Sequence, residues 1–290
     1  VMIQIDELMF SYRGRRVYDG LNMELRDGAV YGLLGRNGAG KTTLMRLIAG
    51  LLDCNSGRIT VNGMTPFRRD PVFLNSIYFV PESFNAPEMR VSDYAATYGA
   101  FYSNYDGDAF TDYMKALSVD PEAAFRRLSF GQRKKALMAF ALSLKTDILL
   151  LDEPGNGLDI PSKLTLRHIL SECASPSRTI IMSTHQVRDI EDIVDHVAII
   201  DGGRLLLDAS TREIDCLVQF VESPQADADA LFSERTAGGF VNIKARRNCS
   251  IDRTHSRMDM EVLFNACVTG GRNFVSSMMN RNKKEVSYVL

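Results

Sequence analysis

The core of the fold is decided by the stretch Gly35-Arg36-Asn37-Gly38-Ala39-Gly40-Lys41-Thr42. It follows an apolar run over 29–34 that has the character of a fully buried strand, and it precedes a helical pattern over 41–49 that Gly50 ends. Its spacing matches G-x-x-x-x-G-K-[ST], in which glycines let the backbone bend so that successive N–H groups point at phosphate oxygens. The stretch therefore predicts a phosphate-binding loop between a buried strand and a helix.

Two side chains of this loop have the chemistry that a nucleotide triphosphate needs. Lys41 supplies a mobile cation for the terminal phosphates, and the Thr42 hydroxyl is a suitable ligand for Mg²⁺. A glycine-rich turn can arise by chance, but the strand before it and the helix after it make that explanation weaker. We therefore expect ATP and Mg²⁺ as ligands. The loop residues expected to bind the nucleotide are Arg36, Asn37, Gly38, Ala39, Gly40, Lys41, Thr42 and Thr43.

A second apolar run, over 148–151, ends in the acidic pair Asp152-Glu153. An acidic strand end by itself is most often a solvated turn. Together with a phosphate loop in the same chain, it is the expected partner of that loop in an open α/β sheet. Asp152 is then expected to hold Mg²⁺ through water, and Glu153 to act as the general base on the attacking water.

The remaining hydrophobic pattern indicates a mixed α/β domain. Alternating residues over 3–5 and 21–25 predict half-buried antiparallel strands, and 58–61 predicts another strand before a tight turn. The segment 91–145 has helical character, whereas the apolar run 178–183 predicts a parallel core strand. These elements form one nucleotide-binding domain with an antiparallel β-subdomain and a helical subdomain.

We expect this nucleotide-binding domain to span 2–210, with the helical subdomain at about 84–145 and a terminal hairpin over 197–207. The character of the sequence changes after residue 210. A strand is expected over 217–222, and a helix over 258–268 is expected to end at Gly270-Gly271. Residues 211–290 are accordingly predicted to form a separate, small α+β domain, to which the sequence assigns no role.

Composition excludes several classes of protein. The chain has 290 residues, of which 45% are hydrophobic and 24% charged, so it is not a disordered protein. A formal net charge of −2 gives no electrostatic reason to expect nucleic acid as a partner. Five scattered cysteines without a Cys-x-x-Cys pair indicate reduced thiols rather than a zinc site or disulfide framework. No run approaches the roughly 20 apolar residues of a membrane span, so any membrane role is expected to depend on another protein.

Four further features carry a resemblance to the ABC (ATP-binding cassette) family. Leu128-Ser129-Phe130-Gly131-Gln132 resembles the signature motif of that family, usually L-S-G-G-Q. Gly157-Leu158-Asp159 resembles the D-loop, His185 the switch histidine, and Tyr12 the aromatic residue that stacks on adenine. Their order along the chain, together with the phosphate loop, matches the family across residues 2–210. The resemblance implies a P-loop NTPase core with antiparallel β and helical subdomains.

The resemblance also implies a dimer in which Ser129, Gly131 and Gln132 contact the γ-phosphate held by the opposite subunit. Several of the residues that carry the resemblance have a simpler explanation as well. Ser129 is a favoured helix cap, a lone histidine such as His185 is most often an ordinary polar residue at a strand end, and Tyr12 is near other aromatic residues that usually pack in cores. The expectation that Asp159 and His185 lie at the nucleotide rests on the resemblance to the family alone.

Two departures from the family pattern refine this expectation. Phe130 replaces the first signature glycine, at a variable position where the side chain is expected to point away from the nucleotide. Glu82, after Val80-Pro81, stands where the family usually has a glutamine that reaches Mg²⁺, and this Pro-Glu form resembles a branch of exporters. The segment 101–106 resembles bacterial exporter ATPases in the same way, although Asn104 and Gly107 fit an ordinary turn at the end of a helix equally well. A carboxylate at residue 82 is still able to contact the metal, although it adds negative charge beside Asp152 and Glu153.

The chain is therefore expected to be the ATP-hydrolysing motor subunit of an ABC transporter, most consistent with export, that powers a separate membrane permease. Its second ATPase subunit is either an identical copy or a paralogue. We expect it in the cytoplasm, peripheral to the inner face of the membrane, and the sequence does not identify the cargo.

One alternative is a soluble ABC ATPase that acts on a macromolecular complex, but the chain lacks the second cassette, the long coiled coils and the zinc-binding cysteine pairs typical of such proteins. The other alternative, a P-loop kinase, is disfavoured by the ordered motifs.

Overall fold

The computed structural model describes residues 3–246 and 258–285. Its centre is a six-stranded sheet in which all neighbouring strands are parallel except the last pair. In spatial order the strands are β5 (Ile77–Val80), β6 (Ile148–Asp152), β7 (Thr179–Thr184), β3 (Val30–Leu34), β8 (His196–Asp201) and β9 (Arg204–Ser210). Every residue of β3, β6 and β7 is buried, as their continuous apolar runs predict for strands covered on both faces. The expected β8–β9 hairpin is confirmed.

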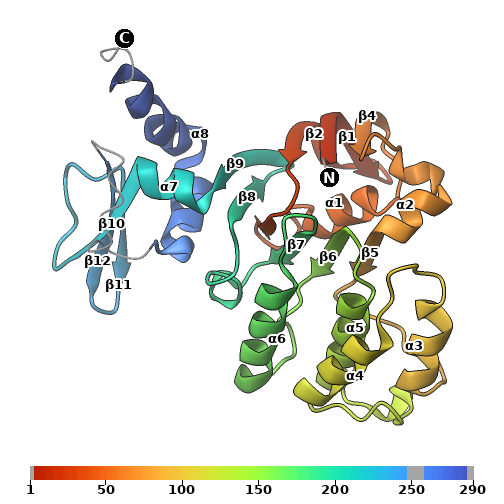
Figure 1. Cartoon of the computed structure of the whole chain (residues 1–290). Helices are drawn as coiled ribbons and strands as arrows, with labels where there is room; N and C mark the ends of the chain where they lie inside the picture. Colours follow the sequence, from red (N-terminus) through yellow and green to blue (C-terminus); the bar gives the residue numbers. More distant parts are fainter. Residues whose placement is uncertain (1–2, 247–257, 286–290) are drawn as a thin grey trace.

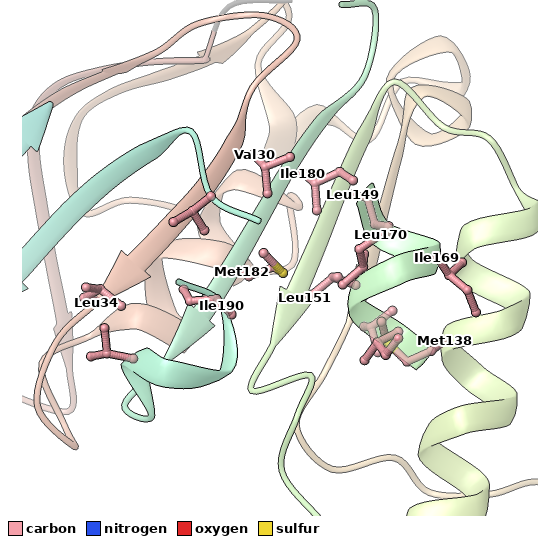
Figure 2. Packing of buried hydrophobic residues seen from close by; sticks show 14 of the residues in the cluster. Val30, Leu34, Met138, Leu149, Leu151, Ile169, Leu170, Ile180, Met182 and Ile190 are labelled. Carbon is pink, nitrogen blue, oxygen red and sulfur yellow. The ribbon is translucent and has the colours of Figure 1, made fainter. Parts of the chain in front are cut away.

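Successive residues of the central strands point to opposite faces and enter two hydrophobic clusters. On one face, Leu149, Leu151 and Met182 belong to the cluster that includes α6 (Ile160–Cys173) and α5 (Phe130–Ser143). Figure 2 shows these strand residues beside Ile169 and Leu170 of α6 and Met138 of α5. The sheet is thereby packed between two layers.

The other face of the sheet packs on α1 (Lys41–Ile48) and on an antiparallel sheet of order β2-β1-β4 (Figure 1). Its strands are β1 (Ile3–Tyr12), β2 (Arg15–Leu25) and β4 (Ser56–Val61). The antiparallel strands predicted near the N-terminus are therefore confirmed. Their alternating pattern gives a buried row that packs on Leu44 and Leu47 of α1.

A helical portion follows β5 and lies below the sheet in Figure 1. Its helices are α3 (Val91–Gly99), α4 (Gly107–Ala116) and α5, and α2 (Pro71–Ser76) precedes β5. Aromatic side chains join these helices to the sheet. The ring of Tyr94 lies 5.0 Å from that of Phe140 and 5.2 Å from that of Phe125, and Tyr78 of β5 contacts Phe140 from the sheet side. Short 3₁₀ helices are η1 (Pro66–Arg68), η2 (Phe125–Arg127) and η3 (Val187–Asp189).

The C-terminal portion contains α7 (Thr211–Leu217), a three-stranded antiparallel sheet and the long helix α8 (Met260–Glu285). The sheet has the order β10 (Val218–Ser223), β12 (Gly239–Ala245), β11 (Phe232–Thr236). The predicted strand at 217–222 is confirmed within a residue. The predicted end of the last helix at Gly270-Gly271 is wrong, because α8 continues through both glycines.

Packing on both sides of the glycines explains this continuation. Cys267 before them and Phe274 and Met278 after them are all buried in one cluster. A Cβ added to Gly270 would come 2.7 Å from the Cβ of Phe274, so a small residue suits that position. A glycine inside a helix costs about 1 kcal/mol relative to alanine, which the buried apolar row readily offsets.

Three cysteines of the described residues, Cys54, Cys173 and Cys267, are free, as expected. Cys216 is disulfide-bonded, so the expectation of reduced thiols throughout is wrong at that residue, and Cys249 lies outside the described residues. None of the helices in the described part of the chain combines the length and apolar character that a membrane span needs.

Asp208 of β9 provides a test of stability against pH. Its Oδ1 lies 3.5 Å from Nε2 of His196 and has no hydrogen-bond partner among the described residues. Burial, reinforced by Glu213, raises the pKa of Asp208 from 3.8 to about 6. The protonated form is favoured by the fold, so its contribution to stability is fully present below pH 3.8 and is lost as the pH rises through about 6. Burial lowers the pKa of His196, which opposes this trend on the acid side.

We expect Asp208→Asn to be more stable than the wild type at pH 7 by about 1–3 kcal/mol, since a buried charge is removed. At pH 4 the two proteins should differ by less than about 0.5 kcal/mol from this source. Urea unfolding at both pH values measures the difference. A stability difference that does not change between pH 4 and pH 7 would contradict the assignment.

Candidate functional site

The predicted phosphate loop lies between the end of β3 and the start of α1. Gly38 and Gly40 have φ values of 81° and 109°, which side chains rarely allow. A Cβ on Gly40 would also come 2.6 Å from the hydroxyl oxygen of Tyr18. That hydroxyl donates to the carbonyl of Gly40 at 2.8 Å, and burial raises the pKa of Tyr18, so the phenol stays protonated. Tyr18 therefore supports the loop from its buried side.

Lys41 is buried at the centre of the loop. Its Nζ donates to the carbonyl of Gly35 at 2.6 Å and to that of Arg36 at 3.3 Å. Burial lowers the pKa of Lys41, whereas the nearby carboxylates of Glu153 and Asp152 act in the opposite direction. The first N–H groups of α1 have no acceptor within the helix, so they and the ammonium group suit an anion at this point.

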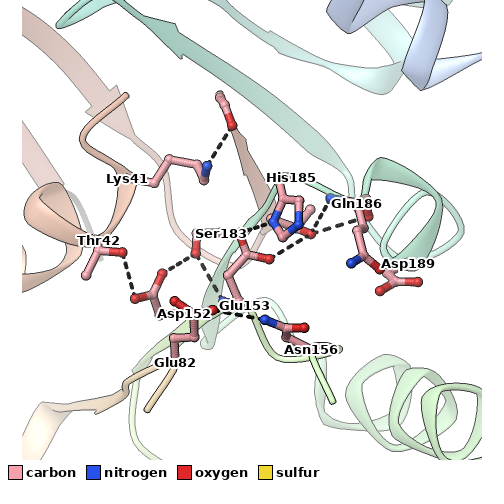
Figure 3. A network of polar contacts seen from close by, with 12 residues as sticks. Lys41, Thr42, Glu82, Asp152, Glu153, Asn156, Ser183, His185, Gln186 and Asp189 are labelled. Atoms are coloured by element: carbon pink, nitrogen blue, oxygen red, sulfur yellow. Dashed lines mark hydrogen bonds and ion pairs between the residues drawn. The ribbon is translucent and has the colours of Figure 1, made fainter. Parts of the chain in front are cut away.

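Asp152 ends β6 next to the loop and is almost completely buried. The hydroxyl of Thr42 donates to its Oδ2 at 2.8 Å, and the hydroxyl of Ser183 donates to its Oδ1 at 2.5 Å (Figure 3). Thr42 and Asp152 thus bring a hydroxyl and a carboxylate oxygen together, which is the kind of ligand set that Mg²⁺ prefers. The described residues contain no cluster of three or more His, Cys, Asp or Glu side chains that could hold a metal ion.

Glu153 has a left-handed backbone with φ 48°, an uncommon conformation for a residue with a side chain. Its N–H donates to the carbonyl of Ser183 at 3.1 Å and approaches the Ser183 hydroxyl at 3.2 Å. Its carboxylate contacts Nδ1 of His185 at 2.8 Å and accepts from the hydroxyl of Thr184 at 3.3 Å. Figure 3 shows the carboxylate of Glu153 beside the ring of His185. Such backbone strain recurs at functional sites.

Glu82 lies in the loop after β5, where its Oε1 accepts from Nδ2 of Asn156 at 2.9 Å. The ammonium group of Lys134, from α5, donates to the carbonyl of the same Glu82 at 3.3 Å and to that of Glu153 at 2.5 Å. Asn156 and Lys134 are residues that the motifs did not identify. They join the Glu82 loop to the end of β6.

An open cleft of about 1170 Å³ lies above these residues. Tyr12, 40% exposed, is at its edge, with its ring 4.8 Å from that of Phe10 and perpendicular to it. Several arginines also line the cleft and give it positive charge suited to a polyphosphate. The lining residues are Tyr12, Arg13, Arg15, Arg16, Val17, Asp19, Asn37, Gly38, Ala39, Gly40, Lys41, Thr42, Thr43, Glu82, Glu153, Asn156, His185, Gly202, Gly203 and Arg204.

The signature segment lies at the start of α5, away from the cleft lining. Ser129 and Gln132 form a reciprocal capping box, with Ser129 Oγ accepting from the N–H of Gln132 at 3.2 Å and Gln132 Oε1 accepting from the N–H of Ser129 at 2.9 Å. Gly131 packs closely on the carbonyl of Gly157, and the ring of Phe130 lies against Gly157. Asp159 caps α6 by accepting from the N–H of Ser162 at 2.9 Å.

The structure therefore brings most of the predicted residues into one cleft and leaves Arg36, the signature and Asp159 outside its lining. Tyr12, loop residues 37–43, Glu82, Glu153 and His185 line the cleft, and Asp152 lies beside Thr42. Ser129, Gly131 and Gln132 stand apart on exposed or half-exposed positions of α5. Their simpler role as a helix cap is present within this chain.

Comparison with known proteins identifies the family. Residues 18–156 match the sequence pattern described as "ABC transporter". The bacitracin transport ATP-binding protein BcrA of Bacillus licheniformis is 31% identical over 210 residues, which cover 71% of this chain and 68% of that protein. The chain belongs to the ABC transporter family. As an ATP-binding subunit of that family, it binds and hydrolyses ATP.

Two further comparisons agree with the family. The Nod factor export ATP-binding protein I of Cupriavidus metallidurans is 29% identical to this ABC subunit over 219 residues, covering 73% of this chain and 72% of that protein. A solved structure titled "Structure of ATP binding subunit of ABC transporter" has a TM-score of 0.66 and 21% identity, and covers 74% of this chain and 92% of that one. The predicted ABC ATPase fold is thereby confirmed.

Proposed function

We propose that this ABC subunit drives export through a separate membrane permease. Among its relatives is a protein named for Nod factor export. The Pro81-Glu82 pair and the segment 101–106 support the same direction. The single observation that carries the ATP-driven part of the proposal is the cleft, in which a phosphate loop, an acidic strand end and His185 meet in a chain of the ABC transporter family.

The chemistry that we propose in the cleft begins with ATP binding to loop residues 36–43, with adenine against Tyr12. Thr42, Asp152 and Glu82 would hold Mg²⁺, which when bound neutralises charge on the phosphates. Glu153 then accepts a proton from the attacking water as its general base. Its contact with His185 at 2.8 Å supports a joint role for the two residues at the γ-phosphate.

We further propose that a second ATPase subunit, identical or paralogous, completes the site. Ser129, Gly131, Gln132 and Asp159 would contact the ATP held by that subunit. Their position outside the cleft, with Ser129 exposed at the N-terminus of the 14-residue helix α5, supports contact with a partner's phosphate. Closure of the dimer on ATP and its opening after hydrolysis would then move the helical portion and the Glu82 loop.

The division of the chain is part of the same proposal. Residues 2–210 would form the nucleotide-binding domain, with a helical subdomain at about 84–145, and 211–290 would form a small C-terminal domain. The protein would lie at the cytoplasmic face of the membrane, held there by the permease. The antiparallel sheet β10-β12-β11 after residue 210 supports the boundary, although α8 also pairs with η3 through Glu261 and Arg188.

Purification of the tagged protein from native membranes tests this function. We expect a protein with several membrane spans to co-purify in near-stoichiometric amount. We propose that the permease docks on the helical portion, where the ring of Phe101 is 72% exposed between α3 and α4. Phe101→Glu should then reduce that recovery by about tenfold, because a charge in an apolar interface is costly. The matched control Leu164→Glu, at a 48% exposed position of α6, should leave recovery unchanged. Recovery of ribosomal or chromosomal components in place of a membrane protein would contradict the proposal.

A further inference from the structure

Lys134 is an unusual residue in the helix that carries the signature segment. It lies five residues after Ser129 in the sequence, and only 5% of its surface is exposed, whereas Arg133 and Lys135 on either side are half-buried. A buried ammonium group is costly unless it is well hydrogen-bonded. In the described chain its acceptors are three backbone carbonyls, those of Glu153 at 2.5 Å, Glu82 at 3.3 Å and Asp152 at 3.4 Å.

These acceptors come from the two segments on which hydrolysis depends. Asp152 and Glu153 are at the end of β6, and Glu82 is in the loop after β5. The ammonium group therefore connects α5 to both segments at once. Replacement by an uncharged side chain of similar length would remove all three connections.

Glu153 is the residue most affected by this arrangement. Its backbone has φ 48°, its N–H is bonded to Ser183, and its carbonyl is bonded to Lys134. The two contacts fix the backbone on opposite sides of the α-carbon. They thereby set the direction of the carboxylate, which points to His185 (Figure 3).

The charges around Lys134 are consistent with a buried cation. Burial lowers the pKa of Lys134, whereas the carboxylates of Glu82, Asp152 and Glu153 act in the opposite direction. The surrounding negative potential thus favours the charged form without any direct carboxylate contact among the described residues.

We propose that Lys134 is a positioning residue that links the signature helix to the backbone of Glu153 and to the Glu82 loop. A movement of α5, such as the one expected when a second subunit binds, is then transmitted to the carboxylate that accepts the proton. This inference rests on the proposed role of Glu153 as the general base.

Steady-state and binding measurements on Lys134→Met test the inference. Because a displacement of about 1 Å in a catalytic group costs up to about a hundredfold in rate, we expect kcat for ATP to fall at least about tenfold. KM for ATP and the affinity for a fluorescent ATP analogue should stay within about twofold, since the phosphate loop is untouched. Lys135→Met, one residue along the same helix, is the matched control and should keep wild-type values. An unchanged kcat in Lys134→Met, or an equal loss in Lys135→Met, would overturn the inference.

A double variant separates this inference from the assignment of the general base. If Lys134 acts through Glu153, Lys134→Met should lower the residual activity of Glu153→Gln by less than about twofold. A further tenfold loss in the double variant would show an independent role and overturn the inference. Wild-type turnover in Glu153→Gln alone would instead refute the base assignment. Should Lys134→Met fail to fold, Lys134→Gln, which replaces the ammonium group with a neutral amide, is the alternative variant. It is expected to lower kcat at least about threefold with KM unchanged, and a normal kcat there would overturn the inference.

Discussion

Glu153→Gln is expected to lower ATP turnover at least about a hundredfold while ATP affinity stays within about threefold of the wild type. The amide keeps the size and hydrogen-bonding reach of the carboxylate but does not accept a proton from water. The phosphate loop, Thr42 and Asp152, on which nucleotide binding depends, are unchanged. Phosphate release at saturating ATP and Mg²⁺ measures turnover, and titration with a fluorescent ATP analogue measures affinity.

The matched control for this variant is Glu172→Gln, which makes the same chemical change on the exposed end of α6. It should retain wild-type turnover. A Glu153→Gln protein that releases phosphate at the wild-type rate would show that another group activates the water. A large loss of ATP affinity would show that Glu153 acts chiefly in binding.

Lys41→Ala is expected to weaken ATP binding at least about a hundredfold, or roughly 3 kcal/mol. The ammonium group is held in the loop by the carbonyls of Gly35 and Arg36, beside the N-terminus of α1, where the phosphates are expected. Charge-assisted contacts to phosphate are among the strongest hydrogen bonds in proteins. Isothermal titration with ATP and Mg²⁺ measures the effect.

Arg46→Ala removes a cation from the exposed side of the same helix and serves as the control for Lys41→Ala. It should bind ATP like the wild type. Equal affinity in Lys41→Ala and the wild type would refute the assignment of the phosphate loop. Glu153→Gln and Lys41→Ala are thus expected to have different effects: the first lowers turnover, whereas the second weakens ATP binding.

The central sheet and the loop were predictable because their signals are local. The run before Gly35 and the run before Asp152 are continuously apolar, and each ends in the residues that form the site. Parallel strands place their carboxyl ends at one edge, so Thr42 and Asp152 meet although 110 residues separate them. The order of the motifs along the chain was then enough to identify the family.

Residues that support the site were not predictable in the same way. Tyr18 and Ser183 have no motif, and their roles depend on which strands become neighbours. Lys134 has one weak signal in the sequence, its place two residues before the apolar run of α5 that begins at Ala136. The end of the last helix was predicted wrongly at Gly270, because packing of Phe274 and Met278 outweighs the local preference of glycine. Likewise, spacing alone did not reveal the disulfide at Cys216.

The chemical identity of the nucleotide bound to Glu153→Gln tests most directly the claim that this cleft binds ATP and hydrolyses it through Glu153. The wild type and the variant are mixed with ATP and Mg²⁺, separated from free nucleotide after several wild-type turnover times, and their bound nucleotide is resolved by chromatography. We predict that the wild type retains ADP or no nucleotide, whereas Glu153→Gln retains intact ATP. ADP in place of intact ATP on Glu153→Gln would contradict the account.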